Sequence, residues 1–201
     1  MSILNSIKGL FVPTSNRKNP SEGFTLVELL VVIAIIGILA TLLLLQLTVA
    51  RGKARDVKRI SDINQMRTSV ELYFDDNAQY PDTNNFGTLP SFSPTYINQI
   101  PQDPLAVSGC TAGVYNGTDV GSQSCYGYTW HPTTSAPTRF QLWAELEQWT
   151  AALGSDADIN SLSGGTWPGV GGGANINGTL DASSGCSNTV VRDCVYDQGT
   201  N

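Results

Sequence analysis

Residues 23–50 read GFTLVELLVVIAIIGILATLLLLQLTVA, and the 22 residues from Leu29 to Ala50 contain neither a charge nor a proline. At a rise of 1.5 Å per residue, this run makes roughly 33 Å of helix, which is enough to cross the hydrocarbon core of a bilayer. The run is too long and too far along the chain for a secretory signal peptide, and no A-x-A site follows it. It therefore predicts a transmembrane helix.

The start of this run resembles a known processing signal. Gly23 followed by Phe24-Thr25-Leu26-Val27-Glu28-Leu29-Leu30 is similar to the prepilin motif of bacterial type IV pilins and type II secretion pseudopilins. The resemblance implies that a membrane-embedded aspartic peptidase cleaves after Gly23 and methylates the new N-terminal Phe24. Two departures are Glu22, where the family often has Lys or Arg, and the lack of a proline in the apolar half.

Glu28 lies about one turn inside the apolar run. A charge within a membrane span is costly and is by default a functional hypothesis that needs a named partner. The resemblance implies that Glu28 neutralises the Phe24 amine of a neighbouring subunit, and the two charges would then offset each other's desolvation. An amine–carboxylate contact within one chain is the alternative, because residues four apart share a helix face. A chance glutamate in an ordinary membrane anchor is a third interpretation.

The pattern and the resemblance together divide the chain into four parts. Residues 1–23 are the predicted leader, and residues 24–50 the transmembrane, filament-core half of a long helix. Residues 51–77 are its amphipathic outer half, and residues 78–201 a loop-rich β head with a C-terminal Gly/Ser-rich disulfide region. The expected fold class is α+β and pilin-like, with a small antiparallel sheet packed on the outer half of the helix.

The outer half of the helix carries one apolar stripe at helical spacing. A coiled-coil seam is the alternative, but the heptad is not kept. The helix is expected to end near Asp75–Asn77, ahead of Pro81. The stripe consists of Val57, Ile60, Ile63, Met66, Val70 and Tyr73.

Alternation predicts a β-hairpin in the head. Residues 126–130 and 140–147 each alternate apolar and polar or small side chains, and residues 131–137 form the turn between them. One face of the second strand is apolar (Phe140, Leu142, Ala144 and Leu146) and is expected to cover the helix stripe. Residues 189–192 are a possible third strand.

All four cysteines lie in the predicted head, where they allow three pairings. Proximity in the sequence favours Cys110–Cys125 and Cys186–Cys194, each of which closes a short loop. A zinc site of four thiolates is the competing interpretation, but no C-x-x-C pair is present. Free buried thiols are the remaining alternative. Disulfides would place the head in an oxidising compartment.

The charges are distributed unevenly along the chain. Residues 1–23 carry +2, residues 24–67 carry +3 and residues 68–201 carry −11. An acidic head argues against nucleic-acid binding by the head as a whole. Contact between the basic helix and an acidic head could support subunit stacking, although two solvated faces explain the charges equally well. The positive-inside rule alone would place the N-terminus outside, whereas the resemblance implies a cytoplasmic leader and an extracytoplasmic head.

The sequence predicts no enzyme. His131 is its only histidine, and neither a nucleophile elbow nor a phosphate-binding loop occurs. Asp156, Asp158 and Asn160 begin like a calcium loop, which makes calcium the one possible cofactor. The pattern then has Ser161 at the glycine position and Trp167 at the glutamate position. A turn or helix-capping cluster is the alternative for these side chains.

The resemblance therefore implies a structural subunit. Its expected function is to polymerise into a type IV pilus used for adhesion, motility or DNA uptake, and the alternative is a major-type pseudopilin of a type II secretion system. A membrane-anchored binding protein or enzyme is a more distant alternative. The implied partners are further copies of the chain, a prepilin peptidase, and the assembly platform and motor proteins. The precursor is expected in the bacterial inner membrane and the polymer at the cell surface.

Overall fold

The computed structural model describes residues 23–105, 110–117, 119–120, 123–133, 135–148, 150–162, 172–173, 176–179, 186 and 194–200. The chain divides into two compact units, residues 1–44 and residues 45–201. The first unit contributes the start of a long helix. The second contains the rest of that helix and all described strands.

Helix α1 extends from Leu26 to Asn77, and its 52 residues include no proline. It ends where the sequence predicts. The next residue, Ala78, has a left-handed backbone with φ of 55°, and its N–H donates to the Phe74 carbonyl at 2.7 Å. A left-handed residue directly after the last turn is a common helix stop, although glycine usually occupies it.

A four-stranded antiparallel sheet has the order β5-β3-β4-β6. The predicted hairpin is confirmed, because β3 and β4 pair with Gly127 opposite Trp143 and His131 opposite Arg139. The possible third strand at residues 189–192 lies outside the described residues. The strands of the sheet are β3 (Gly127–His131), β4 (Arg139–Glu145), β5 (Gly172–Gly173) and β6 (Val195–Gly199).

Short elements complete the head. Strands β1 (Asp119–Val120) and β2 (Gln123–Ser124) form a separate two-stranded ladder. The 3-10 helices are η1 (Phe86–Thr88) and η2 (Leu153–Ser155), and α2 spans Phe92–Thr95.

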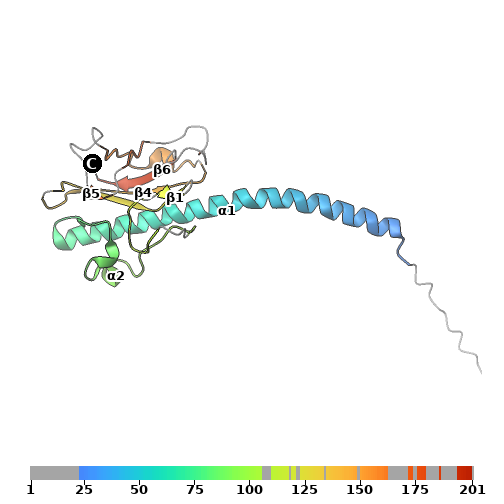
Figure 1. The fold of residues 1–201 in the computed structure, drawn as a ribbon, viewed down its shortest axis with the longest axis horizontal. Helices are drawn as coiled ribbons and strands as arrows, with labels where there is room; N and C mark the ends of the chain where they lie inside the picture. The colour runs from blue at the N-terminus through green and yellow to red at the C-terminus, as the bar shows by residue number, and fades with distance from the viewer. Residues whose placement is uncertain are drawn as a thin grey trace, which may run out of the picture. The chain divides into compact units, whose positions relative to one another are not determined.

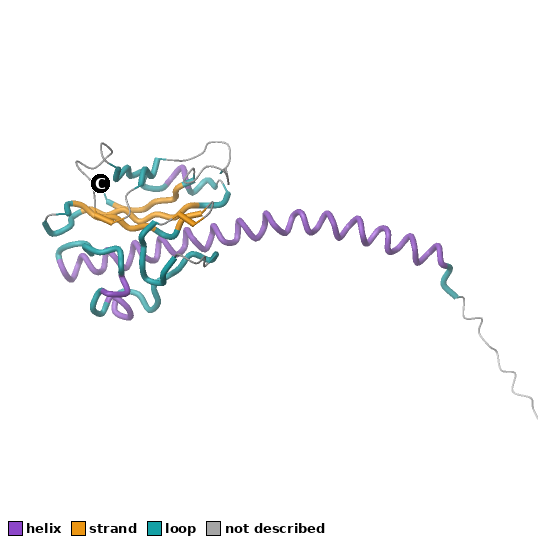
Figure 2. Tube along the Cα trace, in the orientation of Figure 1, coloured by secondary structure: helices purple, strands orange, loops and turns teal. Residues whose placement is uncertain are grey.

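The main core lies between the C-terminal half of α1 and one face of the sheet. Figures 1 and 2 show the sheet along one side of this half of the helix and α2 on the other. Ile63, Met66 and Val70 from the helix are fully buried, together with Phe140 and Leu142 from β4. The predicted packing of the hairpin on the helix stripe is therefore confirmed. Aromatic rings from η1, α2 and β3 extend the core, with Phe86 and Tyr128 centroids 4.9 Å apart.

One residue of the predicted stripe was assigned to the wrong environment. Val57 is 67% exposed, whereas Ile63, Met66 and Val70 are buried and Ile60 and Tyr73 pack at the edge of the core. The head does extend this far along the helix, since Asp56 is buried. Val57 lies roughly 120° around the helix axis from Ile63, so it points away from the face that the head covers.

The prediction that β4 has one apolar face was incomplete, because the structure buries both faces. On the face opposite the main core, Trp143 is fully buried with Ile176 and Val195. Gly127, its partner on β3, leaves room for the indole: a Cβ on Gly127 would lie 2.1 Å from a Trp143 ring atom. A segment far along the chain covers this face, so alternation within β4 alone could not reveal the burial.

Candidate assembly site

The N-terminal end of α1 is a reciprocal capping box. The Thr25 N–H and hydroxyl both donate to Oε2 of Glu28, at 2.9 and 2.6 Å, and the Glu28 N–H donates back to Thr25 Oγ1 at 3.2 Å. Threonine at the cap with glutamate three residues later satisfies free N–H groups of the first turn. The T-x-x-E spacing could have revealed this role of Glu28 from the sequence.

The capping box bears on the predicted partner of Glu28. In the structure, the Glu28 carboxylate accepts hydrogen bonds from two groups of Thr25. The predicted donor, the Phe24 amine, does not exist in the uncut chain, where the Phe24 nitrogen is part of a peptide bond. Both bonds end on Oε2. Among the described residues, Oε1 accepts no hydrogen bond, so one oxygen caps the helix and the other is available to a further donor.

The helix that follows Glu28 is exposed over its whole circumference. The large apolar side chains that the structure describes between Phe24 and Val49 are all more than two-fifths exposed. α1 is the one helix in the described residues that is long and apolar enough to span a membrane, and none of its most apolar window is buried. A helix that is apolar on all sides needs lipid or other protein around it.

In the second unit, a buried ion cluster joins α1 to the head. Arg59 is fully buried, and its guanidinium donates to Asp56, Asp103 and Glu147 at 2.8, 2.6 and 2.8 Å. Burial opposes the charged guanidinium, but the three carboxylates outweigh it and raise the pKa of Arg59 above its usual range. Arg55 binds both oxygens of Glu147, with Nε 2.6 Å from Oε1 and Nη2 2.5 Å from Oε2.

Asp56 also binds the backbone of the head. Its two carboxylate oxygens accept the N–H groups of Glu147 and Gln148, both at 2.9 Å. The cluster thus connects the helix to the segment after β4 through side-chain and main-chain contacts. We call Arg55, Asp56, Arg59, Asp103 and Glu147 the Arg59 cluster.

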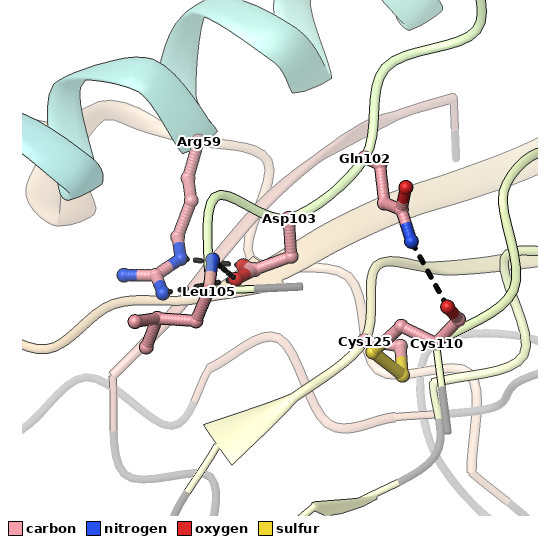
Figure 3. The surroundings of a disulfide bond; sticks show 6 residues. All are labelled: Arg59, Gln102, Asp103, Leu105, Cys110 and Cys125. Carbon is pink, nitrogen blue, oxygen red and sulfur yellow. Dashed lines mark hydrogen bonds and ion pairs between the residues drawn. A yellow bond between two sulfur atoms is a disulfide. The ribbon is translucent and has the colours of Figure 1, made fainter. Parts of the chain in front are cut away.

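The Cys110–Cys125 disulfide lies beside the loop that supplies Asp103 (Figure 3). Within this loop, Gln102 Nε2 donates to the Cys110 carbonyl at 2.9 Å, and the Leu105 N–H donates to Asp103 at 2.9 Å. The Tyr115 hydroxyl donates to the Pro101 carbonyl at 3.0 Å. The loop closed by the disulfide therefore contacts the segment that orients Asp103 toward Arg59.

Both favoured cysteine pairings are present. Cys110–Cys125 and Cys186–Cys194 have Cα separations of 5.4 and 5.5 Å. All four cysteines are used, so no thiolate remains for the alternative zinc site.

The residues of the predicted calcium loop lie close to β6. Asp156 Oδ2 accepts the Asp197 N–H at 3.1 Å, and Asn160 Oδ1 accepts the Leu162 N–H at 3.1 Å. Asp158 is exposed, and Trp167 lies outside the described residues. No group of three or more His, Cys, Asp or Glu side chains that could hold a metal occurs in the part of the chain that the structure describes. Calcium binding stays a prediction.

Asp197 was missed by the sequence analysis. It is fully buried on β6, and its Oδ2 accepts Gln141 Nε2 at 2.7 Å and the Ile159 N–H at 2.9 Å. Burial raises its pKa to about 6, against the opposing effect of these hydrogen bonds. A lone aspartate in a strand gives no burial signal in the sequence.

The chain is an α+β protein in which one long helix, apolar enough toward its N-terminus to span a membrane, carries a small disulfide-bonded head. The prokaryotic N-terminal methylation motif matches residues 18–44. The chain is 38% identical over 100 residues to type II secretion system core protein G of Klebsiella michiganensis, covering 70% of that protein and 44% of this chain. The core protein G of Aeromonas hydrophila is 36% identical, with the same coverage. The chain therefore belongs to the pilin and pseudopilin family.

A pilus protein also matches. The type IV wide pilus major component PilA4 of Thermus thermophilus is 45% identical over 60 residues, which is 30% of this chain and 46% of that protein. No solved structure matches the chain.

Proposed function

We propose that the chain is a pseudopilin, a structural subunit that polymerises through its N-terminal helix into the filament of a type II secretion system. The observation that carries this proposal is the match to secretion core protein G over 70% of the relative's length. The comparisons thus favour the alternative named in the sequence analysis over the type IV pilus.

The exposed helix supports polymerisation. Lipid can cover its apolar surface before assembly, and helices of further copies can cover it in a filament. In both surroundings the Glu28 carboxylate is remote from water, where an unpaired charge is costly. Cleavage after Gly23 would create one new cation, the Phe24 amine. Oε1 of Glu28 is the oxygen free to accept it from an adjacent copy.

The processing residues follow from the same proposal. A prepilin peptidase in the inner membrane would cleave after Gly23 and methylate Phe24, and an assembly platform with its motor would extract the mature subunit. Intact-mass analysis of assembled filaments tests this step. The expected mass starts at Phe24 and includes one methyl group. A dominant species that keeps residues 1–23 would contradict it.

The assembly role of Glu28 is tested with two variants. Glu28→Ala is expected to leave processed subunit in the membrane fraction but few sheared filaments. Glu28→Gln keeps the shape and an acceptor for the Thr25 donors, so it isolates the effect of the charge. Wild-type filament yield from both variants would show that Glu28 is not needed, as in an ordinary membrane anchor.

The type IV pilus is the second candidate function, because PilA4 is the relative with the higher identity over its shorter match. Gene deletion separates the two candidates. Loss of protein export with unchanged surface pili supports the pseudopilin, whereas loss of surface pili with normal export supports the pilin. Under the pseudopilin proposal, the precursor resides in the inner membrane and the head is extracytoplasmic.

A further inference from the structure

A group of five basic side chains directly follows the apolar run, at residues 51–59. Three of them form ion pairs with carboxylates of the fold, and these three are Arg55, Lys58 and Arg59. Arg51 and Lys53 are exposed, and neither has an ion-pair partner in the part of the chain that the structure describes. We call Arg51 and Lys53 the juxtamembrane cations. The fold thus leaves two cations of the five for a partner from outside.

The juxtamembrane cations are also the two that lie at the depth of lipid headgroups. Counted from Ala50, the last residue of the apolar run, Arg51 and Lys53 lie about 1.5 and 4.5 Å further along the helix axis. The polar headgroup layer is roughly 5–7 Å thick on each side of the hydrocarbon core. Arg55 lies at its outer edge, about 7.5 Å beyond Ala50, and Lys58 lies outside it at about 12 Å. Depth and pairing therefore select the same two side chains.

The head covers the helix between the two cations. Gly52 is buried, and a Cβ added to it would lie 3.5 Å from Glu147 Oε2. Successive helical residues are about 100° apart around the axis, so Arg51 and Lys53 leave the helix on either side of this covered strip. One neighbouring helix could not contact both, whereas lipid headgroups surround the helix wherever the head leaves it open. The geometry therefore fits a membrane surface better than a single protein partner.

The acidic composition of the head does not oppose an anionic partner at this end. Asp103 and Glu147 reach α1 here, and both accept hydrogen bonds from Arg59. Asp56, on the helix itself, is buried and binds the same guanidinium. Each of these carboxylates is in contact with a cation, so an approaching phosphate meets the two exposed cations and no unpaired carboxylate of the Arg59 cluster.

We propose that Arg51 and Lys53 bind the phosphates of anionic phospholipids, in the leaflet on the side of the head. Guanidinium and ammonium groups form charge-assisted hydrogen bonds with phosphate oxygens, and basic side chains next to a membrane span are attracted to anionic lipid surfaces. The contact fixes the depth of the helix and holds the covered strip at Gly52 next to the membrane surface. It rests on the membrane-inserted precursor of the proposed function and gives that state a lipid partner.

Native mass spectrometry of the full chain in a mild detergent tests this contact. The chain is incubated with equal amounts of dioleoylphosphatidylglycerol and dioleoylphosphatidylcholine, which differ only in their headgroups. The wild type is expected to retain phosphatidylglycerol preferentially. Arg51→Gln/Lys53→Gln should lower this preference by at least about five-fold, which is the effect of one basic side chain near an anionic surface. Arg51→Lys keeps the charge and should behave like the wild type.

The matched control is Arg67→Gln/Arg139→Gln, which removes the same amount of charge from positions farther from the apolar run. Arg67 lies about 24 Å along the helix from Arg51, and Arg139 begins β4. This variant should keep the preference for phosphatidylglycerol. Equal losses in the two double variants would show a general effect of net charge and overturn the contact. Equal retention of the two lipids by the wild type would also overturn it.

Inorganic phosphate separates a lipid contact from a site for a free anion. Phosphate and chloride buffers of matched ionic strength should give the same preference for phosphatidylglycerol. A preference that phosphate removes and chloride leaves intact would assign Arg51 and Lys53 to a soluble anion instead. These measurements need no filament, so the lipid contact can fail while polymerisation stands. A chain that stays soluble without detergent would overturn both.

Discussion

Arg59 on α1 and Asp103, 44 residues further along the chain, form a buried ion pair with Nε and Oδ2 2.6 Å apart. This pair, with Asp56 and Glu147, joins three segments that are distant in sequence. Removing one member of such a cluster leaves charges buried without compensation.

The first prediction concerns the stability of this cluster. Arg59→Met keeps much of the volume but leaves Asp56 and Asp103 buried without their cation, and it should lower the free energy of unfolding by about 3–5 kcal/mol. Urea unfolding of the detergent-solubilised full chain, followed by tryptophan fluorescence, measures this. Adding Asp103→Asn should recover part of the loss.

The control for this prediction is Arg67→Met. Arg67 pairs with Glu71, both side chains being more than two-fifths exposed, and it also donates to Gln198 Oε1 at 2.7 Å. Its loss should cost about 1–2 kcal/mol, less than the loss of Arg59. Equal effects of the two substitutions would show that the Arg59 cluster does not stabilise the attachment of the head.

The second prediction concerns the Cys110–Cys125 disulfide. The double variant Cys110→Ser/Cys125→Ser should unfold more easily by about 3 kcal/mol, the value expected for a closed loop of about 15 residues. Because the closed loop contacts the Asp103 segment, hydrogen exchange of the Leu105 N–H should also accelerate. Unchanged exchange at Leu105 would indicate that this segment is ordered by Arg59 alone.

The third prediction concerns pH. The pKa of Asp197 is raised to about 6 in the folded chain, above the ordinary value of 3.8. A raised carboxyl pKa favours folding when the group is protonated, so this contribution is present below pH 3.8 and is lost as pH rises through 6. Asp197→Asn should therefore gain stability relative to the wild type between pH 4 and pH 7, by up to about 3 kcal/mol.

Thermal unfolding at several pH values, with a chelator present so that no calcium contributes, measures this gain. Asp82→Asn changes an exposed carboxylate, and the effect of that change should stay within about 0.5 kcal/mol. A constant difference between Asp197→Asn and the wild type across the pH range would contradict the assignment.

The fourth prediction concerns the helix start. Thr25→Val removes the hydroxyl that exchanges hydrogen bonds with Glu28, and it should destabilise the first turn by about 1 kcal/mol. Thr25→Ser keeps the hydroxyl and should behave like the wild type. Hydrogen exchange of the Glu28 N–H in detergent micelles distinguishes the two, and equal exchange in both variants would exclude the capping role.

The fifth prediction concerns the helix end. Ala78 has a left-handed backbone, which glycine adopts without the steric penalty of a Cβ. Ala78→Gly should therefore raise the free energy of unfolding by about 0.5–1 kcal/mol, measured by the same urea titration. A loss of stability would show that the side chain of Ala78 makes contacts that outweigh its backbone strain.

Local sequence was sufficient for features that depend on neighbours along the chain. The apolar run at residues 29–50, the helix end before Pro81 and the β3–β4 hairpin each follow from composition and spacing within one segment. The two disulfides join cysteines 15 and 8 residues apart, so sequence proximity favoured the observed pairing. The capping box of Thr25 and Glu28 is equally local and was available from its spacing.

Tertiary structure alone decided which polar groups are buried. Arg59 has the same sequence surroundings as the exposed Lys58, yet it is fully buried because Asp103 and Glu147 arrive from distant loops. Trp143 and Asp197 are buried because the segments at Ile159 and Ile176 cover the second face of the sheet, while Val57 is 67% exposed. Burial depends on which distant segments meet, and local periodicity carries no information about that meeting.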